Sequence, residues 1–404
     1  MTARFPLMIP LEEARTYVLD RCTRRAATFT PVSDALGLVT AAEVIAEEAI
    51  PPFANTAMDG FAVRSFDVTT VPVQLRIIET IAAGYGPKLV VGAGEASRIM
   101  TGAPIPEGAD AVVMVEKTSV TGDVVTIEVA VEEGNHIRPA GDDVAIGQMV
   151  FAASTVLTAG HLGVLCSLGM NEIETYPRLR VGVMSTGDEL VDDGGHLGPG
   201  QIRDSNRRTL ISLLTADGFV AIDLGLVPDE EEAIESALLQ GADHCDAIVT
   251  SGGVSMGDFD YVKAVLDSVG DMRWMQIAIK PAKPLAFGTI GHTPVFGLPG
   301  NPVSSMVSYE LFARPGLRAM MGFPEPIRTT IQGVAAEPLV RHRDGKTHYS
   351  RVSASYQDGR ILVRSVTGQG SHMLTSMARS NALAVLPNGD GCDEGDVVDI
   401  LLLN

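Results

Sequence analysis

Four short apolar runs between residues 180 and 298 each end in a cluster of polar, charged or glycine residues. The clusters occupy residues 185–189, 251–258, 280–284 and 299–304. In an open α/β sheet, ligands collect at the carboxyl ends of the strands. If the four runs are parallel strands, their loops meet at one edge of the sheet. This expected convergence carries more weight than any single cluster.

Two of these clusters contain groups that suit an anion. The small residues 251–253 allow backbone N–H groups to approach a negatively charged ligand closely. Lys280 and Lys283 lie in a loop stiffened by prolines, where two ammonium groups suit a phosphate or a tetrahedral oxometalate. Ser304 follows Pro302 at the expected start of a helix, and a helix N-terminus favours phosphate.

Carboxylates share the same expected edge. Asp188, Glu189, Asp258 and Asp260 offer hard oxygen ligands. Cations and carboxylates together suggest Mg²⁺ bridging to a pyrophosphate, because Mg²⁺ keeps several waters and binds through few carboxylates. Simpler interpretations stay open: Asp188 as a cap, the glycine pair as a plain turn and the lysines as solvated surface charges.

Composition excludes several classes of function. The chain has 404 residues and a formal net charge of −20, so we expect no nucleic-acid partner, since the chain would repel a phosphate backbone. No stretch approaches the roughly 18 apolar residues that span a bilayer, so we expect no membrane partner. The four cysteines form no Cys-x-x-Cys pair, which indicates reduced thiols in a cytoplasmic protein. The eight histidines lack metal-binding spacing, and we expect them to be surface or core residues.

The pattern of apolar and polar residues changes several times along the chain. Residues 11–26 and 34–46 are expected to be helical, and residues 50–145 show short Val/Ile strands between glycines and prolines. From about residue 178 strands alternate with helices, which predicts a parallel sheet with helices on both faces. We expect four modules: a discontinuous N-terminal helical and linker domain (1–48 and 146–177), an inserted β-rich domain (49–145), an α/β domain (178–326) and a C-terminal β domain (327–404).

Six segments match one known family. They are Asn55–Ala62 (NTAMDGFA), Met100–Pro106 (MTGAPIP), Ser185–Leu190 (STGDEL), Ser251–Ser255 (SGGVS), Lys280–Pro284 (KPAKP) and Gly297–Ser304 (GLPGNPVS). The chain resembles the molybdopterin molybdenumtransferase family, which comprises the bacterial MoeA proteins and the E domain of gephyrin. The resemblance covers essentially the whole chain. It implies a multidomain α/β plus β fold, with a three-layer α/β molybdopterin-binding domain, an inserted β-rich module and a C-terminal β-barrel-like module.

The resemblance also implies an activity. Adenylylated molybdopterin would be cleaved and molybdate inserted at its dithiolene with release of AMP, and Mg²⁺ would be required. The enzyme would be a homodimer with an active cleft shared between partners. It would receive its substrate from a molybdopterin adenylyltransferase and pass its product to molybdoenzymes or their chaperones.

The site residues come from two sources. Matching positions of the family imply roles for Asp59, Thr101, Asp142, Asp188, Glu189, Asp229, Asp260, Lys280, Lys283, Ser304, Arg351 and Ser371. Position at the expected strand ends adds Ser185, Thr186, Gly187, Ser251, Gly252, Gly253 and Pro299 as ligand contacts. We expect catalytic roles for Asp59, Glu189, Lys280 and Lys283, and metal binding by Asp188, Glu189 and Asp258.

One stretch departs from the family pattern. The family commonly shows Gly-Arg, an aromatic residue and then Arg-Gly in the last module. Here Lys346 replaces the first arginine and no glycine follows Arg351. A lysine keeps the charge but loses the bidentate fork. The departure therefore bears on the role of Arg351 and on the affinity for molybdate.

Two other enzyme classes and one non-catalytic function share parts of this sequence pattern. An adenylyltransferase would share the α/β domain but would not need the segment around Asp59. A pyrophosphatase of the competence-damage type would carry Gly-Pro-Thr after its glycine pair, where this chain has Val254, Ser255 and Met256. The alternative from a different class is a non-catalytic molybdopterin-binding scaffold.

Overall fold

The computed structural model describes residues 8–253 and 261–403. The chain divides into two compact units, each treated by itself. The first comprises residues 1–28, 37–39 and 175–404, and the second comprises residues 29–36 and 40–174. The four modules expected from the sequence are a finer division than these two units, and their boundaries stay a prediction.

A six-stranded sheet forms the centre of the first unit. Its order is β16 (Val220–Val227), β13 (Arg180–Thr186), β17 (Ala247–Ser251), β21 (Thr293–Leu298), β20 (Pro284–Ile290) and β18 (Asp271–Gln276). The first four strands are parallel, and β20 is antiparallel to both of its neighbours. The sheet is therefore mixed, yet β18 runs in the same direction as the four parallel strands.

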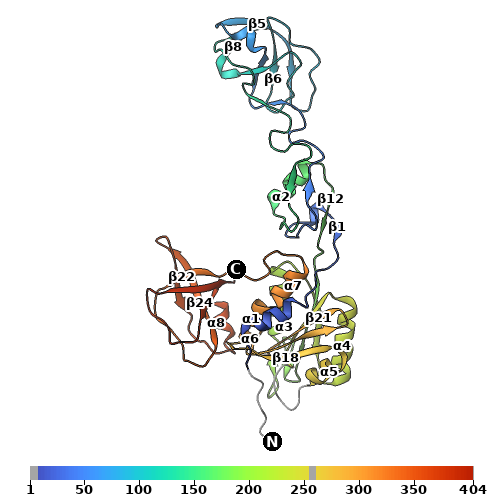
Figure 1. The fold of residues 1–404 in the computed structure, drawn as a ribbon, viewed down its shortest axis with the longest axis vertical. Coiled ribbons are helices and arrows are strands. Elements are labelled where there is room, and N and C mark those ends of the chain that lie inside the picture. The colour runs from blue at the N-terminus through green and yellow to red at the C-terminus, as the bar shows by residue number, and fades with distance from the viewer. Residues whose placement is uncertain (1–7, 254–260, 404) are drawn as a thin grey trace. The chain divides into compact units, whose positions relative to one another are not determined.

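Helices cover both faces of this sheet and complete the three layers that the strand–helix alternation predicts (Figure 1). One face carries α1 (Leu11–Leu19), α3 (Asn206–Ala216), α6 (Pro302–Ser308) and α7 (Arg314–Met320) over a large apolar core. The other carries α4 (Glu231–His244) and α5 (Tyr261–Val269) over a smaller core. A π-helical turn at Tyr309–Ala313 joins α6 to α7, so the helix that is expected to start near Pro302 is present but interrupted.

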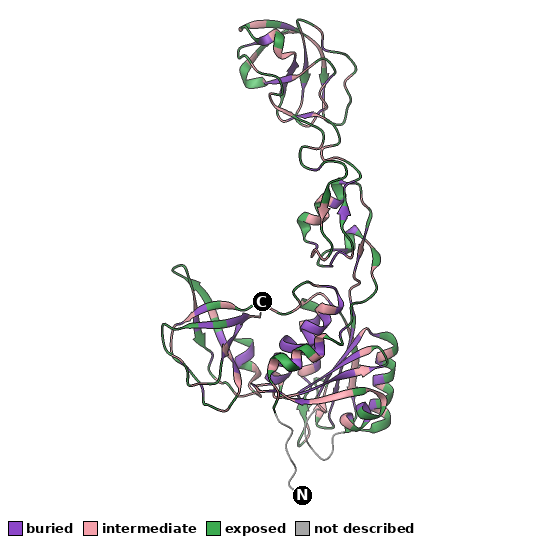
Figure 2. Ribbon diagram, in the orientation of Figure 1, coloured by how far each residue is buried: buried purple, intermediate pink, exposed green. Residues whose placement is uncertain are grey.

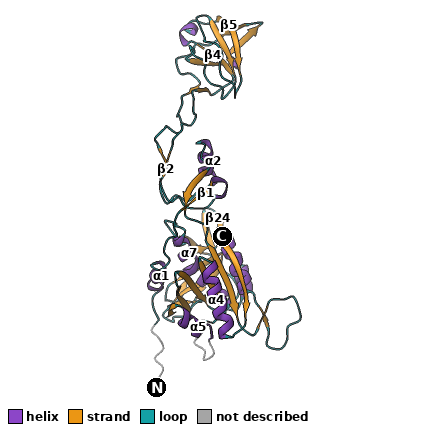
Figure 3. Ribbon diagram, turned by 90° about the vertical axis from the view of Figure 1, so that its right-hand side faces the viewer, coloured by secondary structure: helices purple, strands orange, loops and turns teal. Residues whose placement is uncertain are grey.

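The last part of the chain is a small barrel. Strands β24 (Thr347–Gln357), β25 (Arg360–Ser365), β22 (Ile331–Ala335), β28 (Val397–Leu402) and β26 (Ala382–Leu386) are each paired to the next, and β26 pairs back to β24. The length of β24 lets it contact both neighbours and also β19 (Ile279–Lys280) (Figure 3). Burial alternates along the first part of β28, whereas β26 is buried along almost its whole length, and aliphatic side chains of both strands fill the interior (Figure 2). Helix α8 (Leu374–Ala378) and the pair β23 (Leu339–Val340) and β27 (Gly391–Cys392) accompany the barrel.

The second unit is rich in β-structure. Its main sheet has the order β7 (Ala111–Met114), β4 (Gly60–Val63), β6 (Glu95–Ile99), β5 (Val73–Ile81), β9 (Val124–Ile127) and β8 (Thr118–Thr121). Short pairs join β3 (Asn55–Thr56) to β10 (Ile137–Arg138), β2 (Val44–Ile45) to β11 (Met149–Phe151) and β1 (Thr28–Pro31) to β12 (Glu172–Thr175). The unit also contains helix α2 (Ala159–Ser167) and short 3₁₀ turns at Val32–Asp34, Ser65–Val68 and Val115–Lys117.

Three expected elements differ in the structure. No helix forms over residues 34–46, because Gly37 takes a positive φ of 77° and the backbone of Thr40 bonds to Thr155. The first helix ends at Leu19 rather than near residue 26. The apolar run before the cluster at 280–284 does not continue as one strand: β18 ends at Gln276, and Ile279 and Lys280 pair with the barrel instead.

The structure also bears on two expectations drawn from composition. All four cysteines are free thiols. Within the described parts of the chain, none of the helices combines the length and the apolar character needed to span a bilayer.

Candidate active site

The four polar clusters meet at one edge of the central sheet. Ser185 of β13 lies opposite Ser251 of β17, which lies opposite Leu298 of β21. Since β18 runs in the same direction as these strands, the segment that leads from it to Lys280 begins at this edge too. Within the described residues, the edge therefore gathers the beginnings of all four clusters, as the sequence pattern predicts, while residues 254–258 of the second cluster lie outside the described residues.

Two residues that the sequence analysis missed hold this edge together. The amide of Asn206, at the start of α3, donates to Ser251 Oγ at 2.9 Å and to the carbonyl of Gly300 at 2.7 Å. The buried Asp204 accepts a hydrogen bond from Ser185 Oγ at 3.2 Å. In the sequence these two residues belong to a polar run at the start of an expected helix, and such a run by itself indicates only ordinary helix capping.

A buried arginine anchors the start of the same helix. Arg207 pairs through Nε with Asp204 at 3.0 Å and also pairs with Asp192 and Asp223. Only 2% of Arg207 is exposed, and three carboxylates raise its pKa against the cost of burial. The network fixes the segment that carries Asp204 and Asn206, so their positions at the edge are set by charge pairing.

Three glycines let the backbone come close at the edge. Gly187, Gly252 and Gly253 have φ of 149°, 100° and 67°. A Cβ at Gly252 would lie 2.9 Å from the carbonyl of Thr186, and one at Gly253 would lie 2.3 Å from Val262. This loop therefore needs glycine at both positions. The N–H of Gly252 donates to the carbonyl of Leu298 at 3.2 Å, which ties the loop to the neighbouring strand.

The acidic residues of the edge form a loose group. Asp188 and Glu189 are exposed, and Asp188 accepts a hydrogen bond from the backbone N–H of Asp229 at 3.2 Å. Burial, then the charges of Asp188 and Glu189, raise the pKa of the Asp229 carboxyl. Asp258 and Asp260 lie outside the described residues. Among the residues that the structure describes, no three acidic, histidine or cysteine side chains form a metal cluster.

The two lysines reach the edge without being tied to protein carboxylates. Lys280 is exposed and Lys283 is half-buried, and no salt bridge joins either to another described residue. Between them the buried Ala282 takes a φ of 72°. Pro299 and Ser304, which follow the neighbouring strand, are buried. Among the described residues neither ammonium group is paired with a carboxylate, an arrangement that suits an oxyanion ligand.

Arg351 of the barrel points inward rather than into solvent. Its side chain donates to Ser376 Oγ at 3.1 Å and to the carbonyls of Gly368 and Gly370 at 3.0 and 3.2 Å, and the residue is 1% exposed. Burial lowers its pKa to about 10. The structure thus uses Arg351 to hold the loop that leads to Ser371, whose carbonyl accepts from the N–H of Val303 at 3.1 Å.

The second unit carries the remaining predicted residues. Asp59 and Thr101 are both exposed, and Thr101 donates two hydrogen bonds to the Asp59 carboxylate. These bonds lower the pKa of Asp59. Asp142 is exposed on a separate loop of this unit. The structure therefore brings Asp59 and Thr101 together, whereas Asp142 has no side-chain hydrogen bond to a described residue.

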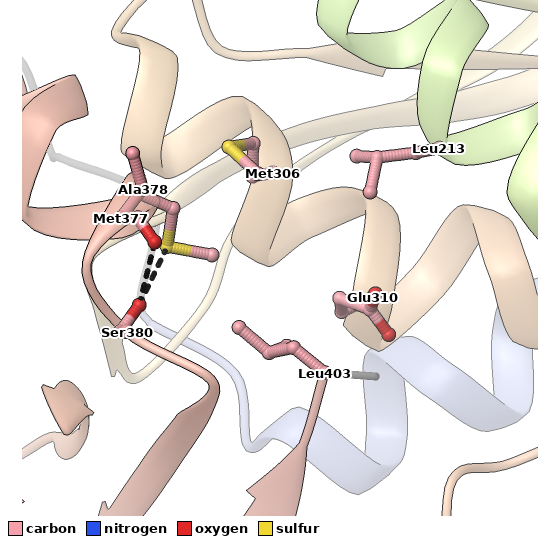
Figure 4. A pocket seen from close by; sticks show the side chains of 7 residues that line it. All are labelled: Leu213, Met306, Glu310, Met377, Ala378, Ser380 and Leu403. Carbon is pink, nitrogen blue, oxygen red and sulfur yellow. Dashed lines mark hydrogen bonds between the residues drawn. The ribbon is translucent and has the colours of Figure 1, made fainter. Parts of the chain in front are cut away.

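One conspicuous pocket is unrelated to these residues. It measures about 200 Å³ and is lined by apolar side chains such as Leu213, Met306 and Met377, with Glu310 and Ser380 at its walls (Figure 4). It lies between the helices and the barrel, away from the glycine loops. The presence of a pocket therefore does not by itself locate the site.

Fold and site together define a class. This is an α/β protein with an appended β-barrel and a β-rich second unit, and the carboxyl ends of its central strands lead into glycine loops, exposed carboxylates and two lysines. Three family models match the chain: the MoeA N-terminal region (domains I and II) over residues 9–169, a probable molybdopterin-binding domain over 182–319, and the MoeA C-terminal region (domain IV) over 333–403. The chain belongs to the MoeA family.

Individual relatives agree with the family models. A molybdopterin molybdenumtransferase from Haemophilus influenzae is 36% identical over 97% of this chain and 98% of its own length. One from Mycobacterium tuberculosis is 38% identical over 92% of this chain and 91% of its own. The crystal structure of the molybdopterin biosynthesis MoeA protein from Pyrococcus horikosii superposes with a TM-score of 0.81 at 28% identity, covering 98% of this chain and all of that one. Resemblance and fold therefore agree along the whole chain.

Proposed function

We propose that this chain is a molybdopterin molybdenumtransferase of molybdenum cofactor biosynthesis, which inserts molybdate into adenylylated molybdopterin and releases AMP. One observation carries the proposal furthest. Lys280 and Lys283 follow the strands of the same sheet edge as the glycine loop at residues 252–253, and neither forms a salt bridge with another described residue. In a chain with a net charge of −20, this is a local concentration of donors for anions.

The reaction joins two anions that repel each other. Molybdate must approach a substrate that carries a pyrophosphate linkage. Preorganised cations and N–H groups reduce this repulsion most where charge accumulates, and they do so without reorganising. In this proposal Lys280 and Lys283 hold the oxometalate, while residues 251–253 and Ser304 hold the phosphates. Asp59 or Glu189 orients the attacking oxygen.

The carboxylates at the edge fit a role in binding Mg²⁺. Mg²⁺ takes oxygen ligands, retains waters and commonly uses only one or two carboxylates besides substrate phosphates. Asp188 and Glu189 are exposed and offer such oxygens, and Asp229 lies against Asp188. Bound there, the ion would neutralise charge on the pyrophosphate. Asp258 is the third proposed ligand.

The proposal extends to assembly and partners. We propose a homodimer in which Asp59 of one copy serves the cleft of the other. The substrate would come from a molybdopterin adenylyltransferase, and the product would pass to molybdoenzymes or their chaperones in the cytoplasm. The mass of the protein in solution and complementation between Asp59→Ala and Lys283→Ala subunits, mixed in one preparation, test the shared cleft. Recovered activity in the mixture is expected.

The central experiment follows AMP release. Purified protein is incubated with adenylylated molybdopterin and Mg²⁺, with and without molybdate. We expect molybdate-dependent AMP release that Lys283→Ala abolishes and that Lys88→Ala, a change of an exposed lysine in the second unit, leaves intact. Binding of the substrate without AMP release would instead support the scaffold alternative.

A further inference from the structure

A cationic pocket lies where Lys280 and Pro281 meet the barrel. It measures about 230 Å³, and none of its lining residues is acidic. Five cationic or titratable basic side chains line it: Lys280, Arg341, His342, His348 and Arg351. Such a concentration of positive charge contrasts with the acidic composition of the chain and favours an anionic occupant.

The two arginines of the pocket use most of their donors elsewhere. Arg341 donates to the carbonyls of His342, Lys346, Leu386 and Pro387 and to the side chains of Asp344 and Asn388. Arg351 donates through Nε to Ser376 and through Nη2 to two backbone carbonyls, and its Nη1 has no hydrogen bond to a described residue. Arg341 therefore shapes the pocket wall and supplies charge at short range, whereas direct donation to a ligand is open to Arg351 Nη1, Lys280 and His348.

Lys280 and His348 are neighbours by strand register. β19 pairs with β24 in parallel, and Lys280 lies directly opposite His348. Residues opposite each other on paired strands project to the same face. The main chain of the α/β domain thus delivers Lys280 next to a histidine of the barrel, and both side chains line the same pocket.

His348 is held in one orientation by Asp344. Its Nε2 lies 3.1 Å from each carboxylate oxygen of Asp344. A carboxylate only accepts hydrogen bonds, so Nε2 carries the hydrogen. Nδ1 has no hydrogen-bond partner in the described part of the chain and is the nitrogen that gains or loses a proton. Protonation would give the pocket one more N–H donor and one more positive charge.

We propose that His348 is a proton-dependent donor to a tetrahedral dianion in this pocket, acting beside Lys280. This inference rests on the proposed function, because molybdate is the dianion that the reaction supplies. A phosphate monoester shares the same chemistry and is the other source. Protonated His348 binds the dianion through Nδ1–H, so affinity rises as the pH falls. Asp344 acts as a positioning residue that keeps the ring turned toward the pocket.

The surroundings of the ring set the direction of the effect. Burial lowers the pKa of His348, the charges of Arg341 and Lys280 lower it further, and Asp344 opposes them. Lys346, which pairs with Asp344 at 3.8 Å, and His342 and Arg351 on the pocket wall are the other basic groups nearby. The strand on the other side presents only Leu386 to His348. The pKa of the free imidazole thus lies below its ordinary value, and a bound dianion would raise it.

Calorimetric titration of the full chain with molybdate between pH 6 and pH 8 tests the proposal. Sulfate, which stays a dianion over this range, is titrated in parallel. Each unit of falling pH should strengthen binding, by up to about tenfold where binding takes up a full proton. His348→Gln should bind with little dependence on pH. His292→Gln changes an exposed histidine in the turn between β20 and β21 and should behave like the parent protein.

Further experiments identify the bound anion and the histidine that takes up the proton. Competition at pH 7 with AMP distinguishes the sources: displacement of molybdate means that the pocket also takes a phosphate monoester. The imidazole signal of His348 should titrate at a higher pH with the dianion present, and Asp344→Asn should lower its pKa. Equal unfolding midpoints for the His348→Gln and parent proteins exclude misfolding as the cause.

Three results would overturn the proposal. The first is a pH dependence of dianion binding that His348→Gln retains. The second is dianion binding that is insensitive to both Lys280→Ala and His348→Gln, and the third is no dianion binding at all. These outcomes are separate from the AMP assay. A protein that binds molybdate through His348 but releases no AMP would refute the proposed reaction and leave this inference intact.

Discussion

Thr101 holds Asp59 through two hydrogen bonds to a single oxygen. Both its backbone N–H and its Oγ1 lie 2.7 Å from Asp59 Oδ1. The two residues are 42 positions apart, yet the turn after β6 brings them together in an exposed part of the second unit. Oδ2 is left free, so the pair presents an oriented carboxylate oxygen.

Replacing Thr101 by valine removes the side-chain bond and keeps the backbone bond. The Thr101 bonds are the main cause of the lowered pKa of Asp59. We therefore expect the pKa of Asp59 to rise toward its ordinary value, and the acid limb of the pH–rate profile to move to higher pH. Activity at pH 7 should fall through loss of orientation rather than loss of charge. Thr101→Ser should restore both, and an unmoved acid limb in Thr101→Val would contradict the role assigned to this bond.

We expect the ionised Asp229 carboxylate to lower the free energy of unfolding at neutral pH. Burial and the charge of Asp188 raise its pKa in the folded protein. A carboxyl with a raised folded pKa favours folding below its unfolded pKa, near 4, and opposes folding once the pH exceeds the folded value. Asp229→Asn should therefore raise the free energy of unfolding by urea at pH 7 and leave it nearly unchanged at about pH 3.5. It should also abolish AMP release. A free energy of unfolding at pH 7 that is lower for Asp229→Asn than for the parent protein would contradict this account.

Asn206 ties two of the converging loops to one helix. Its amide contacts Ser251 and Gly300, so Asn206→Ala removes both bonds and should lower the free energy of unfolding by about 1–3 kcal/mol. The KM for the pterin substrate should rise more than kcat falls, because the loops bind rather than react. Asn206→Asp serves as the matched variant, since it keeps the size but cannot donate. Urea unfolding and steady-state AMP release measure the two effects. An unchanged KM would argue against a role of Asn206 in holding the two loops.

The fold was largely predictable from the sequence, and the site only partly. Apolar runs followed by glycines mark the parallel strands, since a buried strand and a tight loop each need those residue types. The contacts of Asn206, Arg207 and Asp204 were missed because their meaning depends on partners far along the chain. β20 was missed for a related reason: its antiparallel course follows from pairing with both β18 and β21. The clustering of Lys280 with His348 depends on pairing between domains, which no local pattern encodes.

Gly253 and Gly291 separate backbone strain from crowding. Both have positive φ, 67° and 59°, but a Cβ at Gly253 would meet Val262 at 2.3 Å whereas one at Gly291 would meet nothing within 4 Å. Gly291→Ala should cost about 1–2 kcal/mol from the left-handed backbone alone. Gly253→Ala should cost about 1–3 kcal/mol more because Val262 must move. Thermal unfolding measures both, and equal losses would show that the loop at Gly253 relaxes freely.

Arg351 should act on molybdate binding through the loop that it holds. Its guanidinium stays charged at pH 7, because burial lowers the pKa only to about 10. Arg351→Met leaves the carbonyls of Gly368 and Gly370 without donors and should cost about 2–4 kcal/mol of stability, with weaker molybdate binding as the loop to Ser371 loosens. Arg351→Lys keeps the charge but loses the fork, so both losses should be intermediate. Calorimetry and urea unfolding of the two variants decide the matter. Full molybdate affinity in a destabilised Arg351→Lys protein would mean that charge alone matters and that loop positioning does not.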